Sequence, residues 1–494
     1  MTSDFDPEEF FLDDRLDNYR NLSEQVDAYP PESNRDYVLS DFREEFDNLP
    51  DYVTLAGRID GIRDHPNVIF VDLVDESIRT SEEYEGAQMI FVPGELNNED
   101  SYNWLDFLNR GDIIQVSGEP GVSNTGEESL VANEYKPLSK SLLEPPQEDL
   151  SSENRVRDRV AAIQQDDSLL NNLKTKNDIV RSTREYLWDQ GFEEVQTPTL
   201  RSIYGGAEAT PFETHAEALD EDRYLRIALE IPQKKLMAAD MEKIFEIGKV
   251  FRNEDIDTTH NPEFTMVEVY EAFSDREEMM RITEDLVSGI AEDIHGTTKV
   301  TYDDSTIDFS TPWRRMTVEE TINRYGSLDT PIEEMADHEI EELARSQGIE
   351  FPGGFNRGEG IMELYDEMAE GQIQNPTFVI DHPQETSPLC KEHREKEGKA
   401  ERFEAVVAGN ELANSYTERN NPVVQGEHFA QQASRFEAGD EEAHRFDEDF
   451  VKALGRGMPP AGGLGIGIDR LTMLMTDSQS IKDVLYFPMV SRNT

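Results

Sequence analysis

The chain has 494 residues and carries 106 acidic against 46 basic side chains, which gives a formal net charge of −60. A hydrophobic fraction of 36% and an aromatic fraction of 9% exclude a chain that is disordered throughout, and the length suffices for two or three domains. Cys390 is the single cysteine, which excludes an internal disulfide and a four-cysteine zinc site. The N-terminus is acidic and no apolar run reaches ~18 residues, so we expect no signal peptide, no membrane contact and a cytoplasmic location.

The acidic residues are scattered along the whole chain instead of being gathered in one tail. Repulsion among so many carboxylates opposes compaction at low salt. At ~1 M salt the Debye length falls to ~3 Å, which screens most of that repulsion. We therefore interpret the composition as halophilic, an adaptation to a saline cytoplasm. A solvated acidic protein of an ordinary cytosol is the alternative.

Residues 1–50 are predicted to form an acidic, partly helical leader. Between 51 and 140, Gly, Pro, Asn and Asp separate five short segments of alternating apolar and polar residues, "YVTLAGRIDGI", "NVIFVDLVD", "AQMIFVP", "DIIQVSGEP" and "SLVANEYKPL". Five such strands predict a small barrel of the OB type. Residues 141–155 are polar and contain proline, and we expect a linker there.

Residues 156–494 are predicted to form a second domain with an α+β fold. A helical spacing from 173 to 190 places one set of residues on a common face, namely Leu173, Ile179, Val180, Thr183, Leu187 and Trp188. Strand-rich stretches follow as far as Phe273, then a helical stretch, and strands return from "PTFVIDHP" onward. Two helical patterns between about 327 and 372 predict a helical insertion whose carboxylates form a solvated face.

The chain lacks the G-x-x-x-x-G-K-[ST] phosphate loop, the H-E-x-x-H zinc motif and the G-x-S-x-G elbow. Phosphate chemistry would therefore depend on side chains carried by strands. Two predicted strands, 243–254 and 263–273, are joined by "DIDTTHNP". Alternation places Arg252 with Glu254 on a face of the first strand, and it gives the second strand a face with Phe264, Met266, Glu268 and Tyr270. An arginine, a ring and polar anchors suit a ligand with phosphates and a flat ring.

A glycine-rich strand near the C-terminus, "GGLGIGIDR" (462–470), alternates Gly463, Gly465 and Gly467. One face of that strand is therefore bare and can lie against a ring, and Arg470 stands at its end. Close packing of the strand alone would also explain the glycines.

Residues 402–418 predict two strands that meet at a Gly-Asn turn and bring Glu404 close to Glu411. Paired glutamates beside two arginines suggest a nucleotide with Mg²⁺, although solvent-facing carboxylates on a hairpin are the alternative. On the second strand Asn414, Tyr416 and Glu418 share a face. Strict alternation puts Glu411 on the opposite face from Asn414, so a common site requires a local bulge.

Several of these stretches resemble one enzyme class. "FRNEDIDTTHNPEF" resembles motif 2 of the class II aminoacyl-tRNA synthetases, "GGLGIGIDR" resembles motif 3, and "GFEEVQTPTL" resembles the end of motif 1. More narrowly, four segments resemble class II lysyl-tRNA synthetases, "YGGAEATPFETH", "HNPEFTMVEVY", "NPTFVIDHPQETSPL" and "ELANSYTERNNP". The resemblance covers about residues 50–494. The chain departs from the family pattern at "ALEIP", where a proline usually precedes the glutamate, and at Asp255, where glycine is usual.

The resemblance implies an anticodon-binding OB barrel followed by a class II catalytic domain, an antiparallel sheet flanked by helices, in a homodimer. It implies activation of L-lysine with ATP and Mg²⁺, then transfer to the 3′ end of tRNA(Lys), with no DNA partner. The implied ATP contacts are Arg252, Glu254, His260, Asn261, Phe264, Glu404 and Arg470, with Arg252 and Arg470 as the catalytic pair and the adenine between Phe264 and Arg470. The implied Mg²⁺ ligands are Glu404 and Glu411. The implied lysine contacts are Gly206, Glu230, Arg252, Glu268, Tyr270, Asn414, Tyr416 and Glu418.

On the barrel, Phe70 is the candidate for stacking on a base, with a place in the barrel core as its alternative. Arg58 and Arg63 are candidates for phosphate contacts or ordinary surface residues. Three other functions remain open, namely an aspartyl- or asparaginyl-tRNA synthetase, a lysyltransferase that modifies elongation factor P, and a non-catalytic paralogue. A buried ammonium must be paired, so Glu418 with Tyr270 favours lysine over an acidic or amide substrate.

Overall fold

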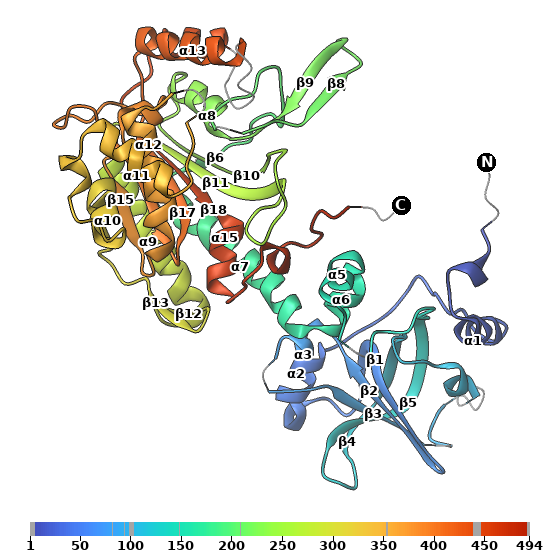
Figure 1. Cartoon of the computed structure of the whole chain (residues 1–494). Helices are drawn as coiled ribbons and strands as arrows, with labels where there is room; N and C mark the ends of the chain where they lie inside the picture. Colours follow the sequence, from blue (N-terminus) through green and yellow to red (C-terminus); the bar gives the residue numbers. More distant parts are fainter. Residues whose placement is uncertain are drawn as a thin grey trace. The chain divides into compact units, whose positions relative to one another are not determined.

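The computed structural model describes residues 5–81, 83–92, 94–97, 103–147, 149–207, 209–351, 354–437 and 446–491 (Figure 1). The first residues of the predicted leader, Glu208 of "YGGAEATPFETH" and residues 352–353 of the predicted insertion lie outside this description. The chain forms two compact units that divide after Asn171. No helix in the described part is long and apolar enough to cross a bilayer.

In the described part of the first unit, five strands form a closed barrel in the order β1-β2-β3-β5-β4. Their bounds are Val53–His65 for β1, Val68–Val74 for β2, Ala87–Phe91 for β3, Ile113–Val122 for β4 and Glu128–Ser139 for β5. The pairs are antiparallel except for β3 with β5. Apolar side chains alternate into the barrel core, for example along β2, because successive residues of a strand point to opposite faces. The predicted OB-type barrel is confirmed.

The acidic leader is not a separate appendage. It contains η1 (Pro7–Glu9), α1 (Asp13–Ser23), α2 (Leu39–Glu44) and η2 (Phe46–Asn48). Leu39 and Phe42 of α2 are fully buried in the barrel core. The short helices α3 (Glu76–Arg79), η3 (Leu105–Phe107), α5 (Ser152–Arg157) and α6 (Arg159–Gln165) also belong to this unit. The division therefore falls later than the boundary expected at 155, within α7 (Asp167–Asp189).

The described part of the second unit is built on an eight-stranded sheet in the order β14-β15-β16-β17-β18-β11-β10-β6. Only the outer pairs β14–β15 and β10–β6 are parallel. The bounds are Arg314–Thr317 for β14, Thr377–Ile380 for β15, Arg402–Val407 for β16, Asn410–Thr417 for β17, Ala461–Gly467 for β18, Glu263–Ala272 for β11, Lys243–Phe251 for β10 and Glu193–Glu194 for β6. The predicted α+β domain on an antiparallel-rich sheet is confirmed.

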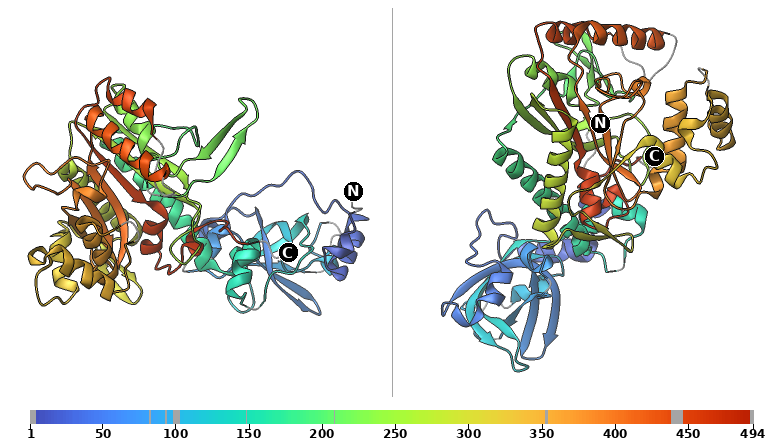
Figure 2. Two further views of the ribbon diagram at one scale, coloured as in Figure 1. Left: turned by 45° about the horizontal axis from the view of Figure 1, so that its top comes forward. Right: turned by 90° about the vertical axis from the view of Figure 1, so that its left-hand side faces the viewer.

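One face of this sheet is covered by α7, α9 (Arg276–His295) and α15 (Ile468–Met475), whose apolar residues share a core with the sheet (Figure 2). The predicted helix 173–190 lies within α7, and Leu173, Ile179, Thr183 and Leu187 are buried as expected. Trp188 is not, because 51% of its surface is exposed. The predicted common face of this helix is therefore buried along most of its length but not at Trp188.

The opposite face is covered only in part. At one end, a helical group packs against β15 and β16, in and beside the predicted insertion at about 327–372; it consists of α10 (Val318–Tyr325), η4 (Ile332–Glu334), α11 (Asp337–Ser346), α12 (Arg357–Met368) and η5 (Glu370–Gln372). Towards the other end, α8 (Glu230–Met237), α13 (Pro422–Glu437) and α14 (Glu448–Leu454) pack around β10 and β11. Between the two groups the sheet face is open.

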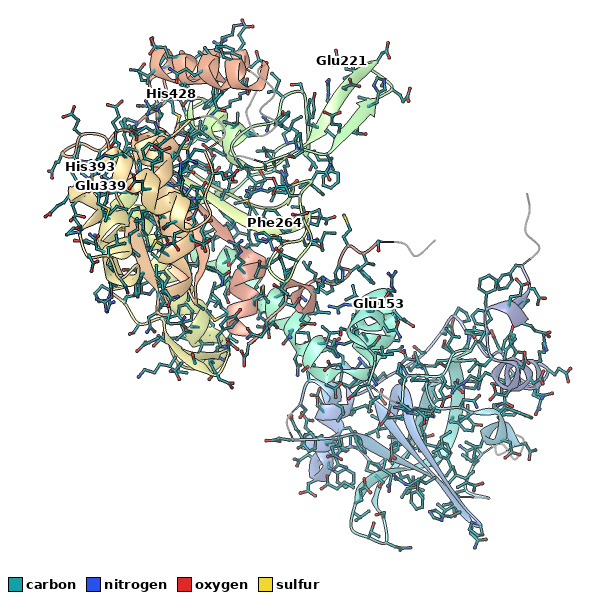
Figure 3. The ribbon with its side chains drawn as sticks, viewed as in Figure 1. Glu153, Glu221, Phe264, Glu339, His393 and His428 are labelled. Carbon is teal, nitrogen blue, oxygen red and sulfur yellow. The ribbon has the colours of Figure 1, made fainter. Side chains whose placement is uncertain are left out.

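The remaining elements are short. The three-stranded sheet β7-β9-β8 contains Leu200–Arg201, Glu221–Leu225 and Glu213–Ala216, and β12 (Lys299–Tyr302) pairs with β13 (Ser305–Asp308). The 3₁₀ turns η6 (Gln384–Thr386) and η7 (Ile481–Val484) lie in connections. Acidic side chains on separate elements, such as Glu153, Glu221 and Glu339, are exposed to solvent (Figure 3).

Candidate active site

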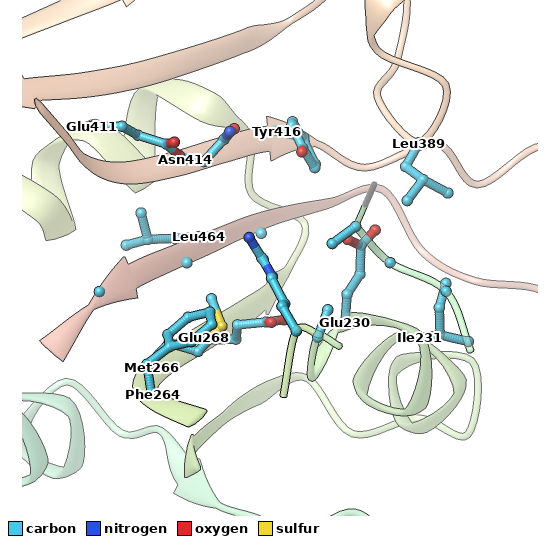
Figure 4. Close-up of a pocket in the computed structure, with 18 of the residues that line it drawn as sticks. Glu230, Ile231, Phe264, Met266, Glu268, Leu389, Glu411, Asn414, Tyr416 and Leu464 are labelled. Carbon is cyan, nitrogen blue, oxygen red and sulfur yellow. The ribbon is translucent and has the colours of Figure 1, made fainter. Parts of the chain in front are cut away.

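A cavity of about 750 Å³ lies on the open face of the second unit's sheet (Figure 4). It is within the usual size range for a small-molecule site. Except for Glu404, all the side chains and the glycine predicted to bind ATP or lysine line this cavity. They are Gly206, Glu230, Arg252, Glu254, His260, Asn261, Phe264, Glu268, Tyr270, Asn414, Tyr416, Glu418 and Arg470, and Glu411 joins them.

The register of the central strands explains how these residues meet. Tyr270 of β11 and Tyr416 of β17 both pair with Gly463 of β18, which lies between them. One step along, Glu268 and Asn414 pair with Gly465. Because the glycines carry no side chain, the side chains from the two outer strands converge over β18 (Figure 4). The glycine strand is therefore the floor of the cavity.

No side chain fits at Gly463. A Cβ added there would lie 1.9 Å from Glu418 Oε1 and 2.7 Å from Tyr270 Cε1. These contacts agree with the prediction that one face of the strand is bare. The groups that cover Gly463 are the Glu418 carboxylate and the Tyr270 ring of the protein itself, not a ligand. Close packing and a binding role for the glycines are thus compatible.

A bulge brings Glu411 to the cavity. The pairing of β16 with β17 runs through Ala405 with Ala413 and then Val406 with Glu411, which leaves Leu412 as the extra residue. Leu412 and Ala413 are consecutive, yet both pack in the core on the helix-covered face. Glu411 and Asn414 therefore share the opposite face, and the bulge required by the sequence interpretation is present.

Three buried carboxylates crowd one end of the cavity, those of Glu230, Glu268 and Glu418. Glu268 accepts hydrogen bonds from the Tyr270 hydroxyl at 2.9 Å and the Leu229 backbone N–H at 2.8 Å. Burial and the neighbouring Glu230 raise the pKa of Glu268 to about 7 despite these bonds. A group of acids so costly to bury is suited to a cationic ligand.

Gly206 lies against one of these carboxylates. Its φ of +97° is a conformation that favours glycine, and an added Cβ would lie 3.3 Å from Glu230 Cβ. The chain thus passes close to Glu230 at this end of the cavity.

We call the other end, which holds Arg470, the cationic end; Asp257, Glu411 and Asp469 also line the cavity. Arg470 donates to the Glu411 backbone carbonyl at 2.7 Å, and its Nη2 lies 3.2 Å from His260 Nε2. The other ring nitrogen of His260 lies 2.9 Å from Asp257 Oδ2. Although burial opposes it, hydrogen bonds from His260 and backbone N–H groups lower the pKa of Asp257 to about 2. An ionised Asp257 thus orients the histidine beside Arg470.

Arg252 follows β10, which ends at Phe251, so the predicted strand 243–254 is shorter than expected. Its guanidinium carbon lies 5.2 Å from the centre of the Phe264 ring. In this structure the cation over Phe264 is therefore Arg252, whereas the resemblance placed Arg470 opposite that ring. Burial lowers the pKa of Arg252, an effect opposed by Glu411 and Glu254.

Glu404 is buried behind the cavity wall. Its Oε1 accepts a hydrogen bond from Arg402 Nη2 at 2.5 Å, and its Oε2 lies 3.4 Å from His382 Nε2. Arg402 itself lines the cavity, 5.6 Å from the centre of the Tyr416 ring. Of the two predicted Mg²⁺ ligands, therefore, Glu411 reaches the cavity and Glu404 is paired with an arginine.

The carboxylates of the insertion are not all solvated. Burial and the nearby Glu404 raise the pKa of Glu370, in η5, to about 8. The expectation of a uniformly solvated acidic face was therefore wrong at this residue.

Two other predicted ATP contacts already bond to the protein: Glu254 Oε1 accepts from the Thr210 N–H, and the Asn261 amide binds Glu263 O and the Met489 N–H.

Sequence reasoning missed Lys234 and Arg402. Lys234 is fully buried on α8, where its ammonium pairs with Glu230 at 2.5 Å and also with Glu418. Its place four residues after Glu230 was a usable signal, since such residues share a helix face. Arg402 stands two residues before Glu404 on one strand, so alternation already put the two on the same face.

The anticodon candidates lie on the barrel of the first unit. Phe70 is half-buried on β2 and is absent from the barrel core cluster. The Arg63 guanidinium lies 5.9 Å from its ring centre and the His65 ring 5.8 Å. Arg58 pairs with Val74 at the other end of the β1–β2 ladder and donates to the Gly111 carbonyl. The structure therefore groups Phe70 with Arg63 and not with Arg58.

Comparison with known proteins agrees with this geometry. The family model for tRNA synthetases class II (D, K and N) matches residues 151–491, and an OB-fold nucleic acid binding domain model matches residues 53–138. The chain therefore belongs to the class II tRNA synthetase family, which makes it an aminoacyl-tRNA ligase.

Relatives within the family narrow the comparison. The chain is 44% identical to a lysine–tRNA ligase of Saccharolobus solfataricus, over 89% of this chain and 87% of that protein. It is 43% identical to a lysine–tRNA ligase of a Thermoanaerobacter species, over 92% and 90%. It is 38% identical to one from Methanospirillum hungatei, over 98% and 96%.

The Gly463→Ala variant tests the cavity floor. Because the new methyl group would displace Glu418 or Tyr270, we expect the KM for the amino acid to rise at least about tenfold, or about 1.4 kcal/mol, with little change in the KM for ATP. Steady-state ATP–pyrophosphate exchange measures both. Gly289→Ala, on α9 with open space around the new methyl group, is the matched control. An unchanged KM in Gly463→Ala would show that this end of the cavity does not hold the amino acid.

Proposed function

We propose that the protein is a lysine–tRNA ligase. It activates L-lysine with ATP to lysyl-adenylate and then transfers the lysyl group to the 3′ end of tRNA(Lys). The observation that carries the proposal is that one cavity holds three buried carboxylates, Glu230, Glu268 and Glu418, together with two arginines, Arg252 and Arg470. The carboxylates fit the two ammonium groups of lysine, and the arginines fit the phosphates of ATP.

Lysine lies over the glycine strand in this proposal. Its α-ammonium group is held by Glu230 beside Gly206, and its ε-ammonium group by Glu418 with Tyr270, close to Glu268. The Tyr416 ring covers the methylene groups, as expected for an apolar sleeve. Arg252 and Asn414 hold the carboxylate. The carboxylate then faces the cationic end, where the phosphates are bound.

ATP occupies the cationic end. Arg252 binds the α-phosphate, Arg470 and His260 bind the outer phosphates, and Phe264 stacks on the adenine. For the adenine to stack, the Arg252 guanidinium moves from the Phe264 ring, where it lies in this structure, towards the α-phosphate. Glu254 and Asn261 complete the nucleotide contacts.

The donor set suits Mg²⁺, which commonly binds one or two protein carboxylates together with substrate phosphates. Glu411 is the first such ligand because it lines the cavity beside Arg470. Glu404 becomes the second if Arg402 exchanges its carboxylate partner for a substrate group. Mg²⁺ would supply neutralisation of the phosphate charges.

The chemistry requires no protein nucleophile. A lysine carboxylate oxygen attacks the α-phosphorus and pyrophosphate leaves, and then a ribose hydroxyl of the tRNA attacks the acyl carbon and AMP leaves. The residues of the chain align the two substrates, and their arginines stabilise negative charge that develops on the phosphoryl oxygens. Rate enhancement comes from positioning and electrostatics.

The rival functions fit less well. An aspartate substrate would place its side-chain carboxylate among Glu230, Glu268 and Glu418, at a large electrostatic cost. Relatives that modify elongation factor P lack a barrel of the kind that residues 53–138 form.

Recognition of the anticodon is assigned to this barrel, with stacking on Phe70 and a phosphate contact from Arg63.

ATP–pyrophosphate exchange with each amino acid, in KCl of about 1 M or more, tests the function directly. We expect lysine to drive exchange and the other amino acids to do so far less, because only lysine supplies a second ammonium group to the acidic end. Equal or faster exchange with aspartate or asparagine would refute the substrate, and no exchange with any amino acid would refute the catalytic role.

The assembly proposed is a homodimer. Trp188 at the end of α7 and Leu200 of β7 are 51% and 52% exposed, and both lie in or beside the stretch that resembles motif 1. A second copy would cover these apolar side chains. We expect light scattering at micromolar concentration and about 1 M KCl to give twice the chain mass, and Leu200→Glu to weaken the dimer. A native monomer under these conditions would contradict the assembly.

The acidic surface is assigned to a saline cytoplasm. Exposed carboxylates on separate elements repel one another, and this repulsion is screened as salt rises. We expect the melting temperature to rise between about 0.2 and about 3 M KCl, and the KM for tRNA to rise only slowly, because few cations of the protein displace counterions. A protein that is most stable at the low end would show that the charge serves another purpose.

A further inference from the structure

A lysine of the protein lies between the two carboxylates assigned to the substrate's ammonium groups. Lys234 is one turn after Glu230 on α8, and its Nζ lies 2.5 Å from Glu230 Oε1. The same ammonium pairs with Glu418, which follows β17. All three side chains are buried, with Lys234 at 0% exposure. This ion-pair network therefore joins the two halves of the amino-acid site.

The charges at this end of the cavity match a diamino acid only if Lys234 is counted. Glu230, Glu268 and Glu418 carry three negative charges when ionised, and Lys234 neutralises one of them. Two charges remain, and lysine brings two ammonium groups. The lysine carboxylate is matched separately by Arg252. Since buried charge is costly unless paired, this balance favours lysine over amino acids with a single ammonium group.

We infer that Lys234 is a positioning and specificity residue of the amino-acid site, which ties Glu230 to Glu418 and leaves one carboxylate charge for each ammonium group of the substrate. The inference rests on the proposed lysine substrate and concerns a residue that does not itself react. Lys234 acts through the two carboxylates, whose oxygens it holds towards the cavity.

The electrostatics of the network agree with this role. Burial lowers the pKa of Lys234, but Glu230 and Glu418 outweigh it and the net shift is upward, so the ammonium stays charged. Burial raises the pKa of Glu418, and Lys234 opposes that rise. The other groups around the network are Glu268, Tyr270, Cys390, Arg402, Tyr416 and Arg419. Removing the ammonium would leave a Glu418 carboxylate that takes up a proton in place of binding lysine.

The sign of the pH effect follows from the carboxylates. Lysine binds their ionised forms, so its KM falls as pH rises through the pKa values of Glu268, about 7, and Glu418, about 8. Without Lys234, the pKa of Glu418 rises, and the fall in KM moves to higher pH. A structural ion pair that did not tune the site would leave this pH dependence in place.

The test is ATP–pyrophosphate exchange by the full-length Lys234→Met and Lys234→Arg variants between about pH 6 and 10. For Lys234→Met we expect the KM for lysine to rise about 100-fold or more, its pH midpoint to rise by at least about one unit, and the KM for ATP to change less than about threefold. Lys234→Arg keeps a permanent cation, so its pH midpoint should match that of the native protein even if its KM rises.

The matched control is Lys140→Met, which breaks an equally buried lysine–aspartate pair with Asp112 in the barrel. It should leave the lysine KM and its pH profile unchanged. A native pH profile in a folded Lys234→Met variant would overturn the inference. If Lys234→Met does not fold, a shifted midpoint in Lys234→Arg would overturn it. Failure of the native protein to use lysine would refute the proposed function itself. This outcome is distinct from the two above, because it is measured on the native protein and not on the Lys234 variants.

Discussion

The cost of burying carboxylates governs the architecture of the catalytic unit. Glu230, Glu268 and Glu418 lie within one end of a cavity at 1% to 5% exposure. A group of like charges in such a place is stable only with cations or protons, and among the described residues the ammonium of Lys234 pairs directly with two of them. The remaining negative charge favours a cationic ligand.

The sheet keeps the two ends of the cavity apart. β11 and β17 lie on either side of β18, and their registers with the glycines place tyrosines and acids over one end of that strand, while Arg470 follows its other end. Arg470 is therefore displaced along the strand direction from the buried acids Glu268 and Glu418, and the glycines between them carry no side chain. A rigid sheet can hold opposite charges apart in this way, where a loop would let them collapse into ion pairs.

The sequence predicted the barrel, the α+β class and the set of cavity residues, because alternation and long joined motifs determine which side chains share a face. It could not predict the exposure of Trp188, since helical spacing shows which residues share a face and not how much of that face is buried. The sequence also could not show which of several possible partners a charged side chain binds. Arg402 binding Glu404, and Arg252 lying over Phe264, depend on three-dimensional distances that spacing along a strand does not contain. The site roles themselves stay predictions.

The bulge at Leu412 offsets the odd spacing of Glu411 and Asn414 along β17. Surface hairpins usually tolerate the gain or loss of a residue during evolution, because the turn absorbs it. Here the extra residue lies inside the ladder, between Glu411 and Asn414. Loss of Leu412 would remove an apolar side chain from the core and leave Glu411 two residues before Asn414, on the same face by simple alternation. A gene encoding this fold could therefore lose this codon without turning Glu411 from the cavity, whereas a regular strand of the present length would turn it to the core.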